Sequence, residues 1–196
     1  MCGPIHGNAG AGPSADELVR QAQAHEAARE EDVAARRYTE ALSIEATHAG
    51  AWIGLGDLRM RLGELAEAER VFTAARARVP SLSRALERRA RIRWAMGRHV
   101  EAEADLEQFA EETGDSSGFR ALAGWFGADG RTPRQLATWR RLLRWADERE
   151  DRSLYAEARL MVRALVALVG DADPASCPIE PDSTRSALAN MARRGR

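Results

Sequence analysis

Apolar residues recur along most of the chain at the three- and four-residue spacing of amphipathic helices, with charged residues between them. Glycine, proline and Ser/Thr/Asp residues interrupt the pattern where helices are expected to begin or end. The pattern predicts a helical pair within residues 49–82 and single helices over residues 15–28, 31–44, 84–98, 119–128, 132–147, 151–169 and 183–193. Almost no strand is expected, because Ala, Leu, Arg and Glu dominate and aromatic residues make up only 6%.

A spacing of small and bulky residues repeats about every 34 residues. Between Trp52 and Pro80 the chain reads W-I-G-L-G-D-L-R and later A-E-R-V-F-T-A-A. The small and large positions of the second part recur as Ala34, Tyr38 and Ala41, as Ala68, Phe72 and Ala75, and as Ala102, Leu106 and Phe109. Gly56 and Ala68 would let two antiparallel helices approach closely, and Pro80 is expected to stop one helix and open the next.

This motif resembles the tetratricopeptide repeat, a helix–turn–helix unit of about 34 residues. The positions that carry the resemblance are Trp52, Leu55, Gly56, Ala68, Phe72, Ala75 and Pro80. The resemblance implies an all-α fold, a right-handed α-solenoid of tetratricopeptide-like repeats with a C-terminal capping helix.

Counting in this register divides the chain into seven parts. They are a flexible N-terminal tether (1–14), three repeats (15–48, 49–82 and 83–116), a degenerate fourth repeat (117–150), a capping helix (151–170), and a Pro-rich loop with a short C-terminal helix (171–196). A cap is expected because a last repeat with a bare apolar face would aggregate. In the third repeat, Arg89 occupies a place that is normally apolar.

Charge, composition and the motifs present argue against several classes of function. All 29 basic residues are Arg, and the net charge of −1 gives no global attraction to nucleic acid or anionic lipid. The histidines and cysteines lack metal-ligand spacing, and the chain has neither a phosphate-binding glycine loop nor a nucleophile elbow. We therefore expect no enzyme activity, cofactor or metal. No apolar run approaches the length of a membrane span.

In the tetratricopeptide family, the first helices of successive repeats line a concave groove. The resemblance therefore implies a partner-binding set here: Val19, Gln23, Glu26, Ile53, Asp57, Met60, Arg84, Glu87, Arg88, Arg91 and Trp94. Their apolar spots and Arg/Trp end suit a protein or peptide segment that is acidic and has an apolar anchor. Some family members grip the carboxylate end of a chaperone tail, but the required lysines and asparagines are missing here. The arginines around Trp94 leave nucleic-acid binding as a weaker alternative to an acidic protein partner.

Cys2 stands at the head of the tether and resembles the lipid-bearing residue of a mature bacterial lipoprotein. Two locations stay open. A cytoplasmic protein is favoured slightly, and the alternative is a periplasmic or outer-membrane lipoprotein that acts as an assembly factor for secretins or pili. The chain contains no apolar signal region. It also stays open whether the chain is a fragment of a larger protein.

Overall fold

The computed structural model describes residues 12–169, and helices fill most of this span. They are α1 (Ala15–Ala27), α2 (Glu31–Ile44), α3 (Ala49–Arg61), α4 (Leu65–Arg78), α5 (Arg84–Ala95), α6 (His99–Thr113), α7 (Ser117–Ala128), α8 (Thr132–Glu148) and α9 (Arg152–Val169). No strand occurs within residues 12–169, so the all-α prediction is confirmed for that span. The expected tether up to residue 11, the Pro-rich loop and the helix at 183–193 lie outside the described residues.

Several helix ends follow from local chemistry. Ser14 caps α1, because its side-chain oxygen accepts a hydrogen bond from the backbone N–H of Glu17 at 3.2 Å. Gly63 and Gly97 follow α3 and α5, and both have a φ of +76°. Glycine adopts this left-handed conformation without the steric cost that a Cβ would bring. The turn between the two helices of a pair is therefore encoded in the same way twice.

Two predicted boundaries around α5 were wrong. The helix ends at Ala95 and not at residue 98, because the left-handed Gly97 cannot continue it. It begins at Arg84, so Pro80 lies in the connection after α4 and does not open α5. Proline still fits that connection, since its missing N–H is incompatible with a helix interior.

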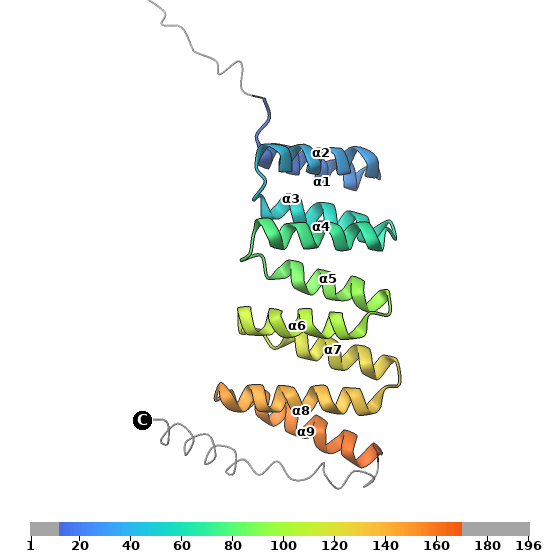
Figure 1. The fold of residues 1–196 in the computed structure, drawn as a ribbon, viewed down its shortest axis with the longest axis vertical. Coiled ribbons are helices and arrows are strands. Elements are labelled where there is room, and N and C mark those ends of the chain that lie inside the picture. The colour runs from blue at the N-terminus through green and yellow to red at the C-terminus, as the bar shows by residue number, and fades with distance from the viewer. Residues whose placement is uncertain (1–11, 170–196) are drawn as a thin grey trace, which may run out of the picture. The chain divides into compact units, whose positions relative to one another are not determined.

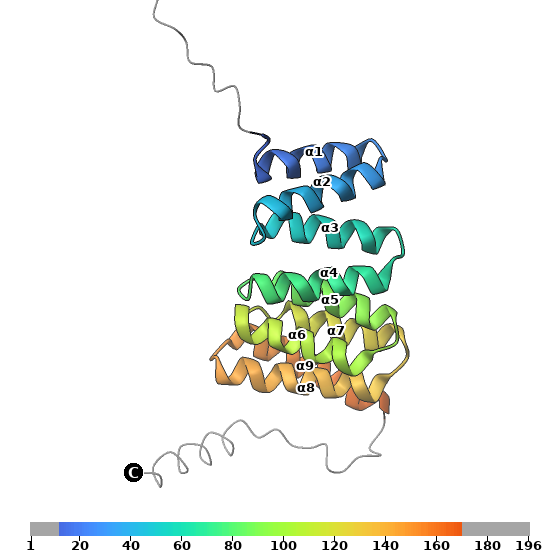
Figure 2. The same cartoon turned by 45° about the horizontal axis from the view of Figure 1, so that its top comes forward.

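The described residues belong to two compact units, residues 12–125 and 126–169, and each is described by itself. In the first unit, each helix from α1 to α6 packs against the next, and consecutive helices run in opposite directions (Figures 1 and 2). Helix α1 also contacts α3, and α3 contacts α5. The odd-numbered helices of this unit therefore form one layer, which positions their side chains on a shared surface.

Two glycines of α3 receive aromatic rings from the helices on either side. A Cβ built on Gly54 would lie 2.3 Å from Cζ of Tyr38 in α2. A Cβ built on Gly56 would lie 2.4 Å from Cζ of Phe72 in α4. Both rings are fully buried, so α3 touches its neighbours at a separation that only glycine allows. The G-L-G stretch is a packing device within a helix and is not a nucleotide-binding loop.

A network of ion pairs joins α4, α5 and α6. The guanidinium of Arg89 donates two hydrogen bonds to the buried carboxylate of Asp105, at 2.9 and 2.7 Å. Arg93 donates to Asp105 at 3.0 Å and to Glu69 at 2.8 Å, and Arg98 pairs with Glu69 as well. Burial acts to raise the pKa of Glu69, but the hydrogen bonds from Arg93 and Arg98 outweigh it and lower that pKa. A buried counter-charge thus explains why Arg89 stands at a normally apolar place.

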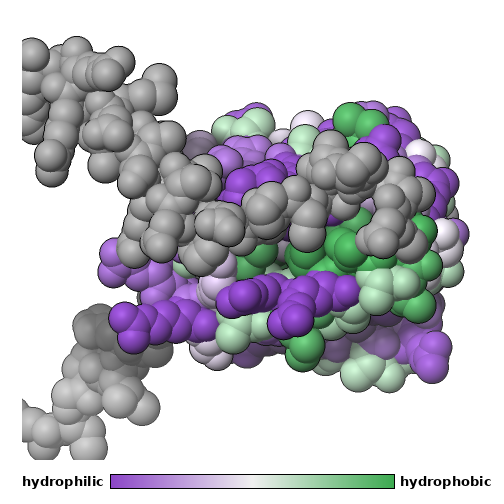
Figure 3. Space-filling model, turned by 90° about the horizontal axis from the view of Figure 1, so that it is seen from below, coloured by the Kyte–Doolittle hydropathy of each residue, from purple (hydrophilic) through white to green (hydrophobic). Residues whose placement is uncertain are grey.

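In the second unit, α9 packs against α8. Helix α8 buries a broad apolar face, and α9 buries a narrower one that consists of Leu154, Ala158, Val162 and Leu165. Apolar side chains also lie on the outside of α9, where Leu160 and Leu168 are exposed. Figure 3 shows one face of the molecule with green apolar surface between purple hydrophilic side chains.

Candidate functional site

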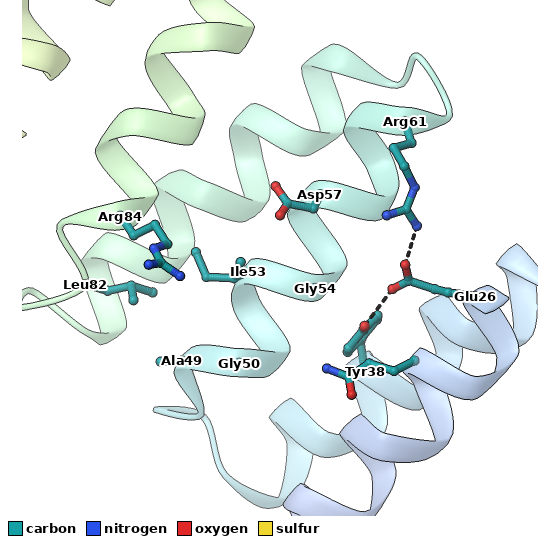
Figure 4. A pocket seen from close by; sticks show the side chains of 11 residues that line it. Glu26, Tyr38, Ala49, Gly50, Ile53, Gly54, Asp57, Arg61, Leu82 and Arg84 are labelled. Carbon is teal, nitrogen blue, oxygen red and sulfur yellow. Dashed lines mark hydrogen bonds and ion pairs between the residues drawn. The ribbon is translucent and has the colours of Figure 1, made fainter. Parts of the chain in front are cut away.

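A hollow of about 520 Å³ opens on the layer of odd-numbered helices in the first unit (Figure 4). Helices α1, α2 and α3 contribute side chains to it, and so do the start of α5 and the connection before it. Its lining residues are Gln23, Glu26, Tyr38, Ala49, Gly50, Ile53, Gly54, Asp57, Arg61, Leu82 and Arg84. Gly50 and Gly54 contribute only backbone atoms to its wall.

One side of the hollow is held by a hydrogen-bonded chain. The phenol of Tyr38 donates a hydrogen bond to Oε1 of Glu26 at 2.6 Å, and Arg61 pairs with Oε2 of the same carboxylate (Figure 4). Burial and the negative charge of Glu26 together raise the pKa of Tyr38 well above its ordinary value, so the phenol stays protonated. Glu26 thereby links α1, α2 and α3 and keeps this wall in place.

Asp57 lies in the middle of the hollow and is half-buried. Its Oδ1 is 3.2 Å from Nε of Arg88, close enough for an ion pair although the two atoms are not aligned as a hydrogen bond. Burial raises the pKa of the Asp57 carboxyl, and the charge of Arg88 opposes that shift. Arg88 therefore offsets only part of the negative charge of Asp57.

The opposite side combines a cation with apolar surface. Arg84 is exposed at the start of α5, and it makes no ion pair or hydrogen bond with any residue in the span 12–169. Ile53 and Leu82 lie beside it and are only half-buried (Figure 4). A carboxylate that approached Arg84 would meet an unpaired guanidinium, and a neighbouring apolar side chain would meet Ile53 and Leu82.

The structure brings five of the predicted groove residues together around this hollow and leaves the others apart. Gln23, Glu26, Ile53, Asp57 and Arg84 line it. The remaining predicted residues are Val19, Met60, Glu87, Arg88, Arg91 and Trp94, and none of these lines it.

Two of the remaining residues have packing roles that the sequence did not reveal. Val19 is only 7% exposed and belongs to the core between α1, α2 and α3. Trp94 lies between two other rings, with its centroid 4.2 Å from that of His99 and 5.2 Å from that of Trp125. Both side chains therefore pack against neighbouring residues, because bulky side chains fill the space between adjacent helices.

The arginines of α5 are mostly engaged within the chain. Arg88 faces Asp57, Arg91 bonds Glu87 at 2.7 Å, and Arg89 and Arg93 belong to the buried network described above. This pairing removes most of the positive charge that a nucleic-acid backbone would require.

The hollow also contains residues that the sequence reasoning missed. Tyr38 was recognised only as a core position, and Arg61 and Leu82 were not singled out at all. Gly54 belongs to the W-I-G-L-G-D-L-R stretch, but the sequence did not identify it as part of the wall of the site. Their proximity depends on how three helices stack, which a linear spacing does not report.

Metal-binding groups and membrane-spanning helices both bear on the kind of site. In residues 12–169, no group of three or more His, Cys, Asp or Glu side chains is arranged to hold a metal ion. None of the helices in that span is both long enough and apolar enough to cross a membrane. Cys2 lies outside the described residues, so the lipoprotein alternative stays a prediction.

Comparison with known proteins gives one family match and several similar solved structures. A family model described as tetratricopeptide repeat matches residues 26–92. One similar solved structure is the first tetratricopeptide domain of Spaghetti (RPAP3), bound to the HSP90 peptide SRMEEVD. Its sequence is 22% identical and the TM-score is 0.53. The match covers 60% of this chain and 94% of that one. MamA is 14% identical with a TM-score of 0.56, and the match covers 70% of this chain and 81% of that one.

A thermophilic tetratricopeptide-repeat protein from Thermus thermophilus is 21% identical with a TM-score of 0.54, and the match covers 75% of this chain and 82% of that one. A comparison with curated protein sequences gives no match. Similarity at these identities establishes the fold alone.

Stacked antiparallel helix pairs with small residues at the crossings and an open hollow on one layer define a helical-repeat protein. Within that class, residues 26–92 match the tetratricopeptide-repeat family, and the solved structures share the same fold. The predicted fold class, all-α with tetratricopeptide-type helix pairs, is confirmed. This fold is of a kind that serves protein–protein interaction, and proteins with it are generally non-enzymatic scaffolds.

Proposed function

We propose that this protein is a non-enzymatic adaptor that binds a peptide segment of another protein in the hollow between α1, α3 and α5. The observation that carries the proposal is the arrangement around Arg84. This guanidinium lacks a partner within residues 12–169, and it stands beside the half-buried Ile53 and Leu82. The other charges that face the hollow, on Glu26, Asp57 and Arg61, already have partners.

This arrangement favours a ligand with a carboxylate next to an apolar side chain. An isolated guanidinium attracts a carboxylate, and half-buried apolar groups gain from being covered by another apolar group. The peptide in the Spaghetti complex, SRMEEVD, combines acidic and apolar residues, which supports the same ligand class. The half-buried Asp57 disfavours a negative charge at the centre of the hollow, so the acidic group of the ligand is expected at the Arg84 side.

The mechanism is recognition by a prearranged surface. Tyr38, Glu26 and Arg61 hold one wall through hydrogen bonds, and Gly54 fixes how closely α2 and α3 approach. The scaffold therefore loses little conformational entropy on binding, and most of the ordering falls on the peptide.

A binding assay with a defined probe tests the proposal. The probe is a fluorescently labelled, unstructured peptide with one Leu flanked by Glu residues, and its affinity is measured by anisotropy. Arg84→Glu is expected to weaken binding at least ten-fold, because it replaces attraction by repulsion. Arg36→Glu, on the exposed side of α2 and away from the hollow, makes the same charge change and is expected to leave affinity unchanged.

The chemistry of the peptide end provides a second arm. Amidation of the peptide's C-terminus should change its affinity less than two-fold, because a side-chain carboxylate suffices at Arg84. Equal affinity of the Arg84→Glu and Arg36→Glu proteins for the probe would refute the assignment of this hollow as the binding site. Circular dichroism of all variants separates lost binding from lost folding.

A further inference from the structure

A line of apolar residues runs along the exposed side of α9. The residues on this face follow one another at four-residue spacing, as Ala156, Leu160, Ala164 and Leu168. All four are exposed, and the two leucines retain 67% and 78% of their surface in solvent. The outer face of a terminal helix in a repeat array is normally polar. Helix α9, the last helix within residues 12–169, presents an apolar line there instead.

A row of arginines runs beside the apolar face. Arg152, Arg159 and Arg163 differ by seven and four positions, which places them on one side of a helix and next to the apolar line. All three are exposed, and none makes an ion pair or hydrogen bond with another residue of the described span. Helix α9 contains only one acidic residue, Glu157, so its exposed side has a net positive charge.

We propose that this face of α9 docks an amphipathic α-helix of another protein, with an apolar stripe and an acidic flank. Alternating small and large side chains at four-residue spacing form ridges and depressions of the kind that a second helix fills. The small Ala156 and Ala164 let the helices approach, while Leu160 and Leu168 insert between side chains of the partner. Acidic residues on the flank of the partner would face the arginine row.

The charge pattern selects this partner over the other candidates. A second copy of the chain would bring the same arginine row to the interface, and each α9 contains only one acidic residue, Glu157. An acidic helix meets both the apolar line and the three cations at once. The proposal does not rest on the function proposed for the hollow, since the two surfaces share no residue.

The test uses the full chain and two synthetic probe peptides. Both peptides carry the same Leu stripe on a helix-forming background; one has Glu along its flank and the other has Arg. The Glu-flanked peptide is expected to bind at least ten-fold more tightly, as measured by fluorescence anisotropy. Leu160→Ser with Leu168→Ser is expected to weaken that binding at least ten-fold, and so is Arg159→Glu with Arg163→Glu.

Matched controls use exposed residues elsewhere. Ile44→Ser with Val100→Ser removes two apolar side chains that are 58% and 72% exposed on α2 and α6, and it should leave the affinity unchanged. Since every substituted side chain is exposed, thermal melting followed by circular dichroism should be nearly the same for all variants.

Each alternative occupant has an outcome that would overturn the proposal. Equal affinity for both peptides, or no binding of either, would refute an acidic helical partner. A dimer in sedimentation that Leu160→Ser with Leu168→Ser dissociates would identify a second copy as the occupant. Binding to phosphatidylglycerol vesicles without binding to the Glu-flanked peptide would identify a lipid surface. A ten-fold gain in peptide affinity when Leu188→Asp and Met191→Asp are introduced would identify the chain's own C-terminal segment as the occupant.

Discussion

Replacing Gly56 by alanine should destabilise the protein although it improves the intrinsic helix propensity of α3. A Cβ at this position would lie 2.4 Å from Cζ, 2.6 Å from Cε1 and 2.8 Å from Cε2 of Phe72. Favourable carbon–carbon contacts have separations of about 3.5–4.0 Å, so the overlap with the ring exceeds about 1 Å. Phe72 is 0% exposed and therefore has no free space into which it can retreat.

The net effect is a balance of two terms. Alanine is favoured over glycine in a helix interior by about 1 kcal/mol. An extra carbon in a closely packed core costs about 1–3 kcal/mol, and this contact lies at the upper end because three ring atoms are too close. We therefore expect Gly56→Ala to lower the free energy of unfolding by about 2 kcal/mol.

Helix α7 offers a matched control. A Cβ built on Gly124 meets nothing within 4 Å, so Gly124→Ala should raise the free energy of unfolding by up to about 1 kcal/mol. Urea unfolding would be followed by circular dichroism and by tryptophan fluorescence together, because stacked repeats can unfold in steps. The reasoning is refuted if both alanine variants change stability in the same direction.

A double-mutant cycle tests whether the ring of Phe72 is the cause. Phe72→Leu removes the atoms that would clash, so Gly56→Ala should cost at least about 1 kcal/mol less in that background than in the native one. An unchanged cost would locate the strain elsewhere in α3.

Three other predictions follow from buried polar contacts. Asp105→Ala should cost about 3–5 kcal/mol in urea unfolding, because it leaves the half-buried Arg89 without a carboxylate and removes one of the carboxylates that Arg93 contacts. Asp32→Ala at an exposed site should cost less than about 1 kcal/mol. Tyr38→Phe should cost about 1.5–3 kcal/mol in the same assay, since Glu26 loses a buried donor, and an unchanged midpoint would contradict the hydrogen bond. The pKa of Glu69 is lower in the folded protein than in the unfolded chain, where it is about 4.3. Ionised Glu69 therefore stabilises the fold fully above that pH, and this stabilisation is lost as the pH falls through the pKa of the folded state. The urea midpoint should therefore decline below about pH 4.5, and Glu69→Gln should make that decline shallower.

The repeat architecture was accessible from the sequence because it depends on residue size at fixed spacing. Gly56 and Ala68 are buried at helix crossings, as their small size predicts, and Phe72 fills the space between the helices. The same spacing identified Tyr38 as a core position. Local chemistry was equally readable at Ser14, whose side chain caps α1.

The site was only partly accessible, because it depends on which side chains meet across helices. Family positions identified Ile53 and Arg84 at the hollow but also selected Val19, which faces the core. The place of a residue on the first helix of a repeat does not by itself show whether its side chain is exposed or buried. The ring of Trp94 contacts the ring of Trp125. The positions of these two residues in the sequence do not predict that contact.

Charge pairing was the least predictable feature. Arg89 was identified as a misfit, but its partner Asp105 lies on another helix, and nothing in the repeat pattern distinguishes that aspartate from solvent-facing acids. The sequence alone does not show whether an aspartate is exposed or buried, because its burial depends on how the helices pack.

The network around Arg93 limits how freely this array can be rearranged. Repeat proteins are often treated as interchangeable modules, but here a guanidinium of the third helix pair finds one of its carboxylates, Glu69, on the second. A chimera that transplanted α5 and α6 into another scaffold would carry the cation and leave that anion behind. A graft should therefore begin at α4, so that Glu69 is transferred together with Arg93.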